Sequence, residues 1–255
     1  MTRPIRTETS DRIARIEIHR PEKKNALTAD MYQAMADAIS AAETDPQVRV
    51  TLIHGQADCF CSGNDLKDFL ERPPHGDDAP VSRFLRVIAT ASKPLVAAVG
   101  GPAVGVGTTM LLHCDLVYAA PDARFQLPFV SLGLVPEAGS SLLLPMIAGH
   151  HRAAELLLLG RPFNAEKALA AGFVTEVIPA ADLLEYARDA AAGVAALPPE
   201  SVRLTKALMK RGHAALVAER MAEESQLFRQ RLGSPEAKEA LTAFFEKRTP
   251  DFSRF

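Results

Sequence analysis

The chain has 255 residues, 47% hydrophobic and 24% charged, a composition that allows one large α/β domain with a sizeable core. The 29 lysines and arginines nearly balance the 31 aspartates and glutamates, which excludes a long-range attraction to nucleic acid or to an anionic membrane. Three cysteines lack the spacing of a metal site or a disulfide framework, so we predict no bound metal and a reducing compartment.

The first part of the chain alternates between strand and helix patterns. Strands are predicted over residues 12–19, 48–53, 94–99, 116–119 and 124–126, and helices over 28–43, 81–91 and 108–112. Thr28 is the expected N-cap of the first helix. Such alternation is typical of a mainly parallel sheet with right-handed crossovers. The segment Arg72–Pro80 is rich in Pro, Gly and Asp, which predicts a flexible surface loop.

From Gly139 onwards, apolar residues at helical spacing dominate. One strand is predicted over 174–178, and later helices over 183–197, 200–211, 214–232 and 235–246. We divide the chain into an α/β core, residues 1–195, and a helical C-terminal region, residues 196–255. This region is expected to cover the core and to contact other subunits. A monomer whose helices cover only its own core stays an alternative.

No targeting segment is evident. Residues 1–10 are polar and charged, unlike a secretory signal. The longest apolar stretches, such as Pro94–Val99 and Ala153–Leu159, are too short to span a bilayer. The ending Ser253-Arg254-Phe255 differs from a peroxisomal Ser-Lys-Leu. We therefore expect a cytoplasmic protein without membrane or nucleic-acid partners.

Two glycine-containing loops, Phe60–Leu66 and Gly100–Gly107, each follow a predicted strand. Glycine lets a backbone approach a ligand closely, and a helix N-terminus offers unpaired amides. Two such loops could direct two N–H groups at one developing oxyanion, each lowering a barrier by about 3 kcal/mol. Tight packing without a ligand is the other interpretation. Nucleotide loops are excluded, because Gly107 is followed by threonine instead of a P-loop lysine and Met110 stands at the last glycine of a dinucleotide motif.

The loops are parts of a longer series of motifs. Phe60-Cys61-Ser62-Gly63-Asn64-Asp65-Leu66 resembles the first motif of the crotonase (enoyl-CoA hydratase/isomerase) superfamily, and Lys93–Gly105 resembles the second. Arg20-Pro21, Asn25-Ala26-Leu27, Cys114-Asp115, Gly133-Leu134 and Ala170–Val174 also fit in order, over nearly the whole chain. The resemblance implies an α/β fold, a crotonase-like spiral of ββα units with a helical C-terminal oligomerisation region, assembled as a homotrimer or a dimer of trimers.

The resemblance also implies an acyl-CoA thioester as the substrate, with coenzyme A as part of it and no separate cofactor. The backbone amides of Ser62 and Val106 would hold the thioester oxygen. The residues Ser62, Gly63, Asn64, Asp65 and Leu66 would contact coenzyme A. Lys24, next to Lys23, would lie near its phosphates, although a solvated turn is the alternative. Asp65 is also interpreted as a structural residue, because Asp commonly accepts from nearby backbone amides.

The acid–base residue decides the reaction. Family hydratases resemble one another in carrying two glutamates, and the matching positions here are Thr109 and Phe129. Pro136-Glu137-Ala138-Gly139-Ser140-Ser141 is instead similar to a stretch of peroxisomal-type Δ3,Δ2-enoyl-CoA isomerases, whose glutamate is the base. Local sequence alone would allow Glu137 to be a helix-start carboxylate worth about 0.3–1 kcal/mol. We expect Phe129, Leu132 and Leu134 to exclude water from it.

These observations predict an enzyme of fatty-acid oxidation that moves the double bond of a 3-enoyl-CoA to C2, with Glu137 as the base. The alternatives are a 2-enoyl-CoA hydratase, another crotonase-type acyl-CoA isomerase, and a catalytically silent CoA-binding scaffold. His113 follows a helical pattern and is interpreted as a buried core histidine, whereas His150-His151 is expected to be exposed.

Overall fold

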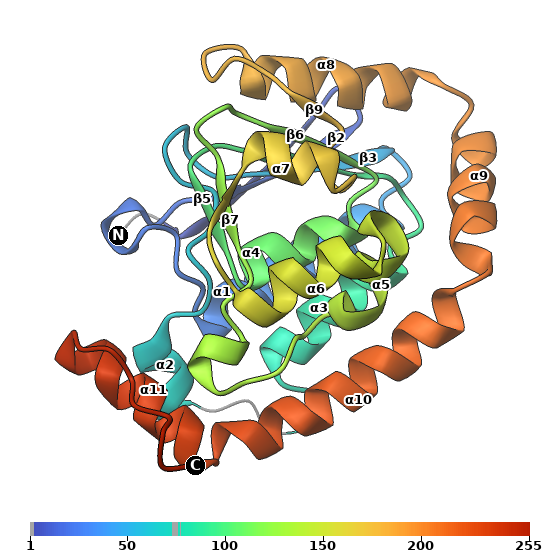
Figure 1. Ribbon diagram of the computed structural model, residues 1–255. Coiled ribbons are helices and arrows are strands. Elements are labelled where there is room, and N and C mark those ends of the chain that lie inside the picture. The colour runs from blue at the N-terminus through green and yellow to red at the C-terminus, as the bar shows by residue number, and fades with distance from the viewer. Residues whose placement is uncertain (1–2, 73–75, 77) are drawn as a thin grey trace.

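The computed structural model describes residues 3–72, 76 and 78–255, and a six-stranded sheet runs through its core (Figure 1). The strand order is β1-β2-β3-β4-β6-β9. The strands are β1 (Ile5–Ser10), β2 (Ile13–Ile18), β3 (Val50–His54), β4 (Leu95–Val99), β6 (Leu116–Ala119) and β9 (Glu176–Val177). β1 is antiparallel to β2 and the other neighbours are parallel, so the sheet is mainly parallel, as predicted.

A second sheet has the order β5-β7-β8, with β5 (Pro102–Val104), β7 (Arg124–Gln126) and β8 (Phe163–Asn164). β5 follows β4 directly and β7 follows β6, so the chain passes twice from the large sheet to the small one. The helices α1 (Ala29–Thr44) and α4 (Val106–Thr109) follow the pairs β1–β2 and β4–β5. Repetition of two strands and a helix is the predicted succession of ββα units.

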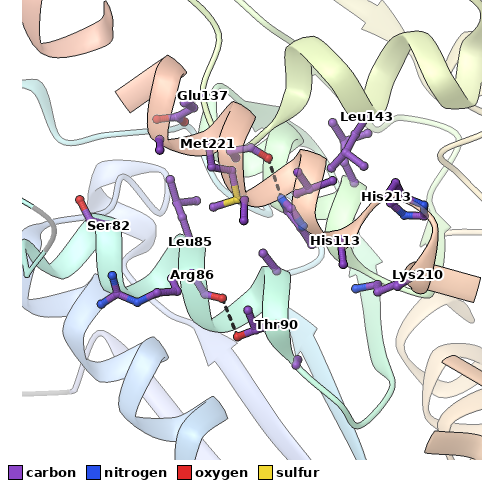
Figure 2. A pocket seen from close by; sticks show the side chains of 18 of the residues that line it. Ser82, Leu85, Arg86, Thr90, His113, Glu137, Leu143, Lys210, His213 and Met221 are labelled. Carbon is purple, nitrogen blue, oxygen red and sulfur yellow. Dashed lines mark hydrogen bonds between the residues drawn. The ribbon is translucent and has the colours of Figure 1, made fainter. Parts of the chain in front are cut away.

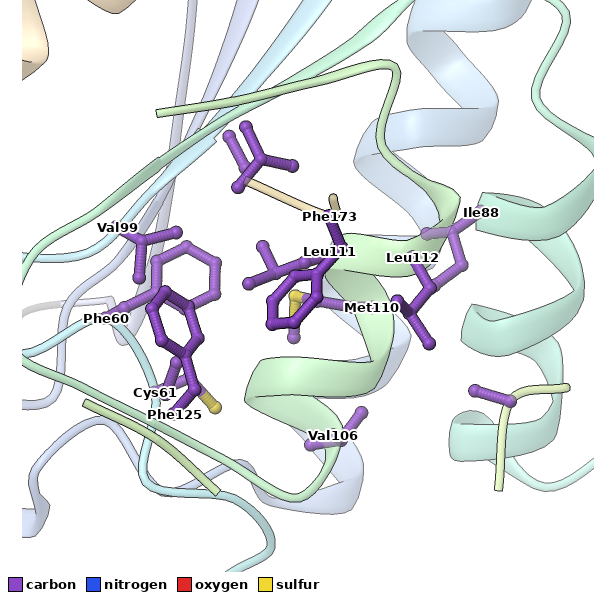
Figure 3. Close-up of a cluster of buried hydrophobic side chains, with 14 of the residues drawn as sticks. Phe60, Cys61, Ile88, Val99, Val106, Met110, Leu111, Leu112, Phe125 and Phe173 are labelled. Atoms are coloured by element: carbon purple, nitrogen blue, oxygen red, sulfur yellow. The ribbon is translucent and has the colours of Figure 1, made fainter. Parts of the chain in front are cut away.

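The helix α1 forms where an N-cap and an apolar stripe coincide. The Thr28 hydroxyl accepts from the Met31 N–H at 3.3 Å, which satisfies one free amide of the first turn. Met31, Met35 and Ile39 are fully buried, and α1 packs against α3 (Pro80–Thr90). The main core lies between these helices and the sheets. Figure 3 shows Phe60, Val106 and Phe125 in this core, and Phe60 and Val106 belong to the two glycine-containing loops.

The remaining helices surround the sheets. They are η1 (Pro21–Lys23), α2 (Leu66–Glu71), η2 (Met110–His113), η3 (Val130–Leu132), α5 (Ser140–Ala148), α6 (His150–Leu159), α7 (Ala165–Ala170), α8 (Leu183–Ala196), α9 (Pro199–Arg211), α10 (Ala214–Leu232) and α11 (Pro235–Glu246). α8 packs on β3 and β4. In Figure 1, α9 to α11 form an arc around the edge of the molecule. The predicted division after residue 195 falls at the last turn of α8. Within the described ranges, no helix is long and apolar enough to cross a bilayer.

Several elements differ from the prediction. β1 was not predicted, because this edge strand is mostly exposed and carries few apolar residues. β5 and β8 are too short for a period-two pattern. The predicted strand 174–178 is reduced to Glu176–Val177, and the helix expected from residue 108 starts at Val106. Of the predicted loop Arg72–Pro80, residues 73–75 and 77 lie outside the described residues, and Pro80 begins α3.

Candidate active site

The two glycine loops lie side by side. Cys61 and Ala103 form a parallel bridge, in which the Cys61 N–H donates to the Pro102 carbonyl and the Val104 N–H to the Cys61 carbonyl, both at 2.9 Å. A Cβ at Gly107 would lie 2.5 Å from the Cys61 carbonyl oxygen. The second loop therefore requires glycine at this position to approach the first.

One predicted amide is not available to a ligand. The Ser62 N–H donates to the Lys24 carbonyl at 3.1 Å, so the prediction of Ser62 as an oxyanion donor is wrong. The N–H groups of Asn64 and Val106 have no acceptor among the described residues. Each belongs to one of the two loops that meet at the Cys61–Ala103 bridge.

Local geometry explains both free amides. Leu27 pairs with Asn64 in a parallel bridge, using the N–H of Leu27 to the Gly63 carbonyl at 2.8 Å and the N–H of Asp65 to the Leu27 carbonyl at 2.9 Å. Because backbone groups alternate in direction along a strand, the Asn64 N–H is directed away from Leu27. Val106 is the first residue of α4, where an N–H has no intrahelical acceptor. The Tyr32 hydroxyl donates to the Asn64 side-chain oxygen and fixes that residue.

The other predicted coenzyme A residues continue from this loop. Asp65 is the N-cap of α2, accepting from the N–H groups of Lys67 and Asp68, and its carboxylate pairs with Arg20 at 2.8 Å. These contacts lower its pKa against the effect of burial and agree with the structural interpretation. Gly63 has a positive φ of 96°, and Leu66 begins α2. Lys24 is exposed and adjoins the loop through its carbonyl.

Glu137 lies in the segment between η3 and α5, three residues before the helix begins at Ser140. The side chain is buried, with 8% of the residue exposed, and its Oε1 atom has no hydrogen-bond partner in the described part of the chain. Burial raises the pKa of Glu137 to about 7; the Glu224 charge adds to the rise and the Thr109 hydroxyl opposes it. Such a carboxylate can act as a base near neutral pH.

A different carboxylate holds the start of α5. Glu224 on α10 accepts from the N–H of Gly139 at 2.6 Å and of Ser141 at 2.9 Å. The alternative of Glu137 as the helix-start carboxylate is therefore wrong, since Glu224 has that role. Ala138 and Gly139 have φ values of 60° and 71°. Because both residues are left-handed, the backbone turns between Glu137 and α5, and Glu137 does not continue the helix.

His113 supports the same turn from the other side. Its Nε2 atom lies 2.7 Å from the Ala138 carbonyl oxygen. Burial lowers the pKa of His113 to about 4, so the ring is neutral at pH 7 and its Nε2–H donates to that carbonyl. The prediction of a buried core histidine is confirmed, and His150 and His151 are exposed.

The two positions of the hydratase glutamates carry no carboxylate. Thr109 is fully buried, and its hydroxyl influences the pKa of Glu137, so this position does lie beside the base. Phe129 is buried in the main core. The site therefore lacks both carboxylates of a two-carboxylate hydratase site at these positions, and Glu137 is its candidate base.

Glu137 lines a cavity of about 650 Å³ between α3, η2, α9 and α10. Its apolar wall near Glu137 comes from Leu85, Leu143, Val217 and Met221, and Figure 2 shows Glu137 and Met221 close together at this wall. The predicted water-excluding residues Phe129, Leu132 and Leu134 do not line it. Val217 and Met221 of the C-terminal helix α10 line it in their place.

Sequence reasoning selected Asn64 only as a coenzyme A contact and missed Glu224 altogether. Asn64 lies within the first motif. Its backbone N–H became the candidate oxyanion donor only because the Ser62 N–H donates to the Lys24 carbonyl. Glu224 is one acidic residue among several on a solvated helix pattern, and no local signal distinguishes it. Only the packing of α10 against α5 brings it to Gly139.

Comparisons with known proteins agree with this fold. The Enoyl-CoA hydratase/isomerase family model matches residues 8–254. The crystal structure of an enoyl-CoA hydratase/isomerase from Pseudoalteromonas atlantica T6c superposes with a TM-score of 0.94 at 43% identity, covering 98% of this chain and 100% of that chain. The chain belongs to the enoyl-CoA hydratase/isomerase family, and the predicted crotonase-like α/β fold is confirmed.

Characterised relatives carry names for different reactions. Enoyl-CoA delta isomerase 2 of Rattus norvegicus is 37% identical over 242 residues, which cover 92% of this chain and 62% of that protein. 2,3-Dehydroadipyl-CoA hydratase of Escherichia coli (strain K12) is 33% identical over 243 residues, covering 94% and 95%. The chain thus spans less than two thirds of the rat isomerase. These two relatives are named for an isomerase reaction and a hydratase reaction.

Proposed function

We propose that this protein is a Δ3,Δ2-enoyl-CoA isomerase, converting 3-enoyl-CoA to 2-enoyl-CoA in fatty-acid oxidation. The observation that carries the proposal is Glu137, a buried carboxylate with a free oxygen and a pKa raised to about 7 at the wall of an apolar cavity. The likeness to the rat enoyl-CoA delta isomerase gives further support.

The reaction needs one base and one oxyanion site. The C2 protons of a 3-enoyl thioester are acidic because the carbonyl and the alkene both delocalise the charge. Glu137 removes one C2 proton, the C2–H electrons form a C1–C2 double bond, and the carbonyl electrons move to the thioester oxygen to give a dienolate that still holds the C3–C4 double bond. The N–H groups of Asn64 and Val106 are the proposed donors to this oxygen. The carbonyl then re-forms, the C1–C2 electrons move to C2–C3, and the C3–C4 electrons take the proton from protonated Glu137 at C4. The carboxylate is thereby regenerated and no cofactor is consumed.

Hydration is the competing reaction. It would require a second carboxylate that positions and activates water. Family hydratases carry glutamates at the two positions that Thr109 and Phe129 occupy here. An apolar cavity also disfavours an ordered nucleophilic water. A single buried base with an apolar surrounding therefore favours proton transfer within the substrate.

The test measures purified protein with 3-hexenoyl-CoA and, separately, with crotonyl-CoA. We expect isomerisation to exceed hydration, and Glu137→Gln to lose turnover while retaining affinity for the thioester. Faster hydration of crotonyl-CoA would overturn the isomerase proposal in favour of the hydratase. Binding of acetoacetyl-CoA with no turnover of either substrate would favour a silent scaffold.

Two further parts belong to this proposal. Lys24 and the segment Ser62–Leu66 are proposed to contact coenzyme A, because they adjoin the oxyanion amides. We also propose a homotrimer or a dimer of trimers in the cytoplasm. Contact with other subunits is supported by apolar side chains on α9, where Leu204, Leu208 and Met209 are 54%, 62% and 69% exposed. The three free cysteines fit a reducing compartment. Sedimentation of the purified protein measures the assembly.

A further inference from the structure

The cavity that contains Glu137 continues well beyond it. α3 and α10 form two of its walls, and residues from Val81 to Thr90 and from Ala214 to Arg229 line it. At one end, Phe69 of α2 meets Phe228 edge to face, next to the loop of the oxyanion amides. At the other end lie Lys210 and His213. An acyl chain that starts at the oxyanion site must extend past Glu137 toward this second end.

The charges around the cavity are strongly unequal. Six of its described lining residues are cationic: Arg86, Arg203, Lys206, Lys210, Arg211 and Arg229. The described lining includes one carboxylate, that of Glu137. Lys206 and Arg203 are paired with Asp115 and Glu200, which lie outside this lining, and the described lining still carries more cationic than anionic side chains.

Lys210 and Lys206 share a single nearby carboxylate. The Lys206 Nζ donates to Asp115 and to the Lys93 carbonyl, both at 2.7 Å, and Asp115 also accepts from the Leu95 N–H at 2.7 Å. The Lys210 Nζ is buried and has no hydrogen-bond partner among the described residues. Burial and the Lys206 charge both lower the pKa of Lys210. A buried ammonium without a partner is costly, and an anion in the cavity would remove that cost.

The position of Lys210 fits the far end of a medium-length acyl chain. A Cβ at Gly139, two residues after Glu137, would lie 3.3 Å from Met221. From Met221 back to Ala214, α10 spans about two turns, roughly 10 Å. Lys210 lies beyond that point, and Figure 2 shows Met221 and His113 between Glu137 and Lys210. An acyl chain that follows this wall from Glu137 would extend toward Lys210.

We propose that Lys210 binds a carboxylate at the far end of the acyl chain, so that the preferred substrates are ω-carboxy 3-enoyl thioesters of coenzyme A. This inference rests on the proposed function, since it assumes that the thioester carbonyl lies at the oxyanion amides. Lys210 acts here as a specificity residue. It takes no part in the proton transfer at C2 and C4.

The test compares substrates of equal length with and without the terminal carboxylate. The pair is 3-octenoyl-CoA and the mono-CoA thioester of 3-octenedioic acid, with six- and ten-carbon pairs to locate the best length. The wild type is expected to favour the dicarboxylic thioester in kcat/KM. Lys210→Met should reduce that preference by roughly 10- to 100-fold, the range for a hydrogen bond between charged groups, while Lys210→Arg should retain most of it.

A binding measurement separates this proposal from the isomerase assignment. Titration calorimetry with suberyl-CoA, octanoyl-CoA and free coenzyme A needs no turnover. Tighter binding of suberyl-CoA that Lys210→Met abolishes supports the carboxylate site even if isomerisation fails. Equal preference in wild type and Lys210→Met overturns it. Weaker binding of all three ligands in Lys210→Met also overturns it, because Lys210 would then serve the phosphates of coenzyme A.

Discussion

The carboxylate of Glu224 accepts a hydrogen bond of 2.6 Å from the backbone N–H of Gly139, 85 positions away along the chain. Its second oxygen accepts from Ser141 at 2.9 Å. Glu224 is buried on α10, and Gly139 ends the left-handed turn that carries Glu137. This contact makes the C-terminal region part of the support for the proposed base.

Replacing Glu224 by Gln should weaken both the fold and the reaction. A carboxamide offers one acceptor oxygen to two N–H groups, so one buried amide loses its partner at a cost of about 1–3 kcal/mol. We expect the melting temperature to fall by several degrees, at about 3 °C per kcal/mol for a chain of this size, and kcat to fall with less change in KM. Thermal unfolding and steady-state kinetics measure these effects.

The matched control is Glu223→Gln. Glu223 is the neighbour of Glu224 on α10, is exposed, and pairs with Arg220 at 3.1 Å. An exposed pair contributes about 0–1 kcal/mol, so this variant should behave like the wild type. Equal effects of the two substitutions would remove Glu224 from its positioning role.

The pH dependence of the reaction should report Glu137. Only the ionised carboxylate can accept the C2 proton, so kcat/KM should rise with pH and level off above the pKa of about 7. The Glu224 charge contributes to the rise in that pKa. In Glu224→Gln the ascending limb should therefore move to lower pH. An ascending limb at the same pH in Glu224→Gln and in the wild type would show that Glu224 only positions the turn and does not raise the pKa of Glu137.

Glu137 should also make stability depend on pH. Its pKa rises from the ordinary 4.5 to about 7 on folding, so the folded state binds more protons between these values and unfolding becomes easier as pH increases. Glu137→Gln removes this penalty, which is at most about 3 kcal/mol. The variant should melt higher than the wild type at pH 8, with a smaller difference at pH 5. Calorimetry at both pH values tests this, and a constant difference would contradict the raised pKa.

The Val106 amide can be removed with little change to the helix. Val106 is the first residue of α4, where proline is tolerated because the N–H has no intrahelical partner. Val106→Pro should lower kcat by about 10²- to 10³-fold, the loss measured for one oxyanion donor. Val106→Ala keeps the amide and is the control for the lost side chain. Similar activities in the two variants would exclude Val106 as a donor.

Local sequence predicted the features that depend on neighbouring residues. The Thr28 cap and the apolar stripe of α1 each have a physical reason within a few residues, whereas the need for glycine at position 107 comes from the Cys61 carbonyl on the other loop. The edge strand β1 escaped prediction because its pairing with β2 leaves most of its side chains exposed. Glu137 could be selected as the base through its motif, whereas its burial and raised pKa depend on α10.

By itself, then, the sequence determined the family, the two facing loops and the single acidic candidate, because these follow from spacing and from residue types that few other structures require. Only the tertiary structure decided that Lys24 occupies the Ser62 amide, that Glu224 holds the turn at Gly139, and that Lys210 is left without a partner. Each of these depends on a contact between segments far apart in the chain. Such hydrogen bonds are set by how helices and loops pack, and residue patterns do not encode them locally.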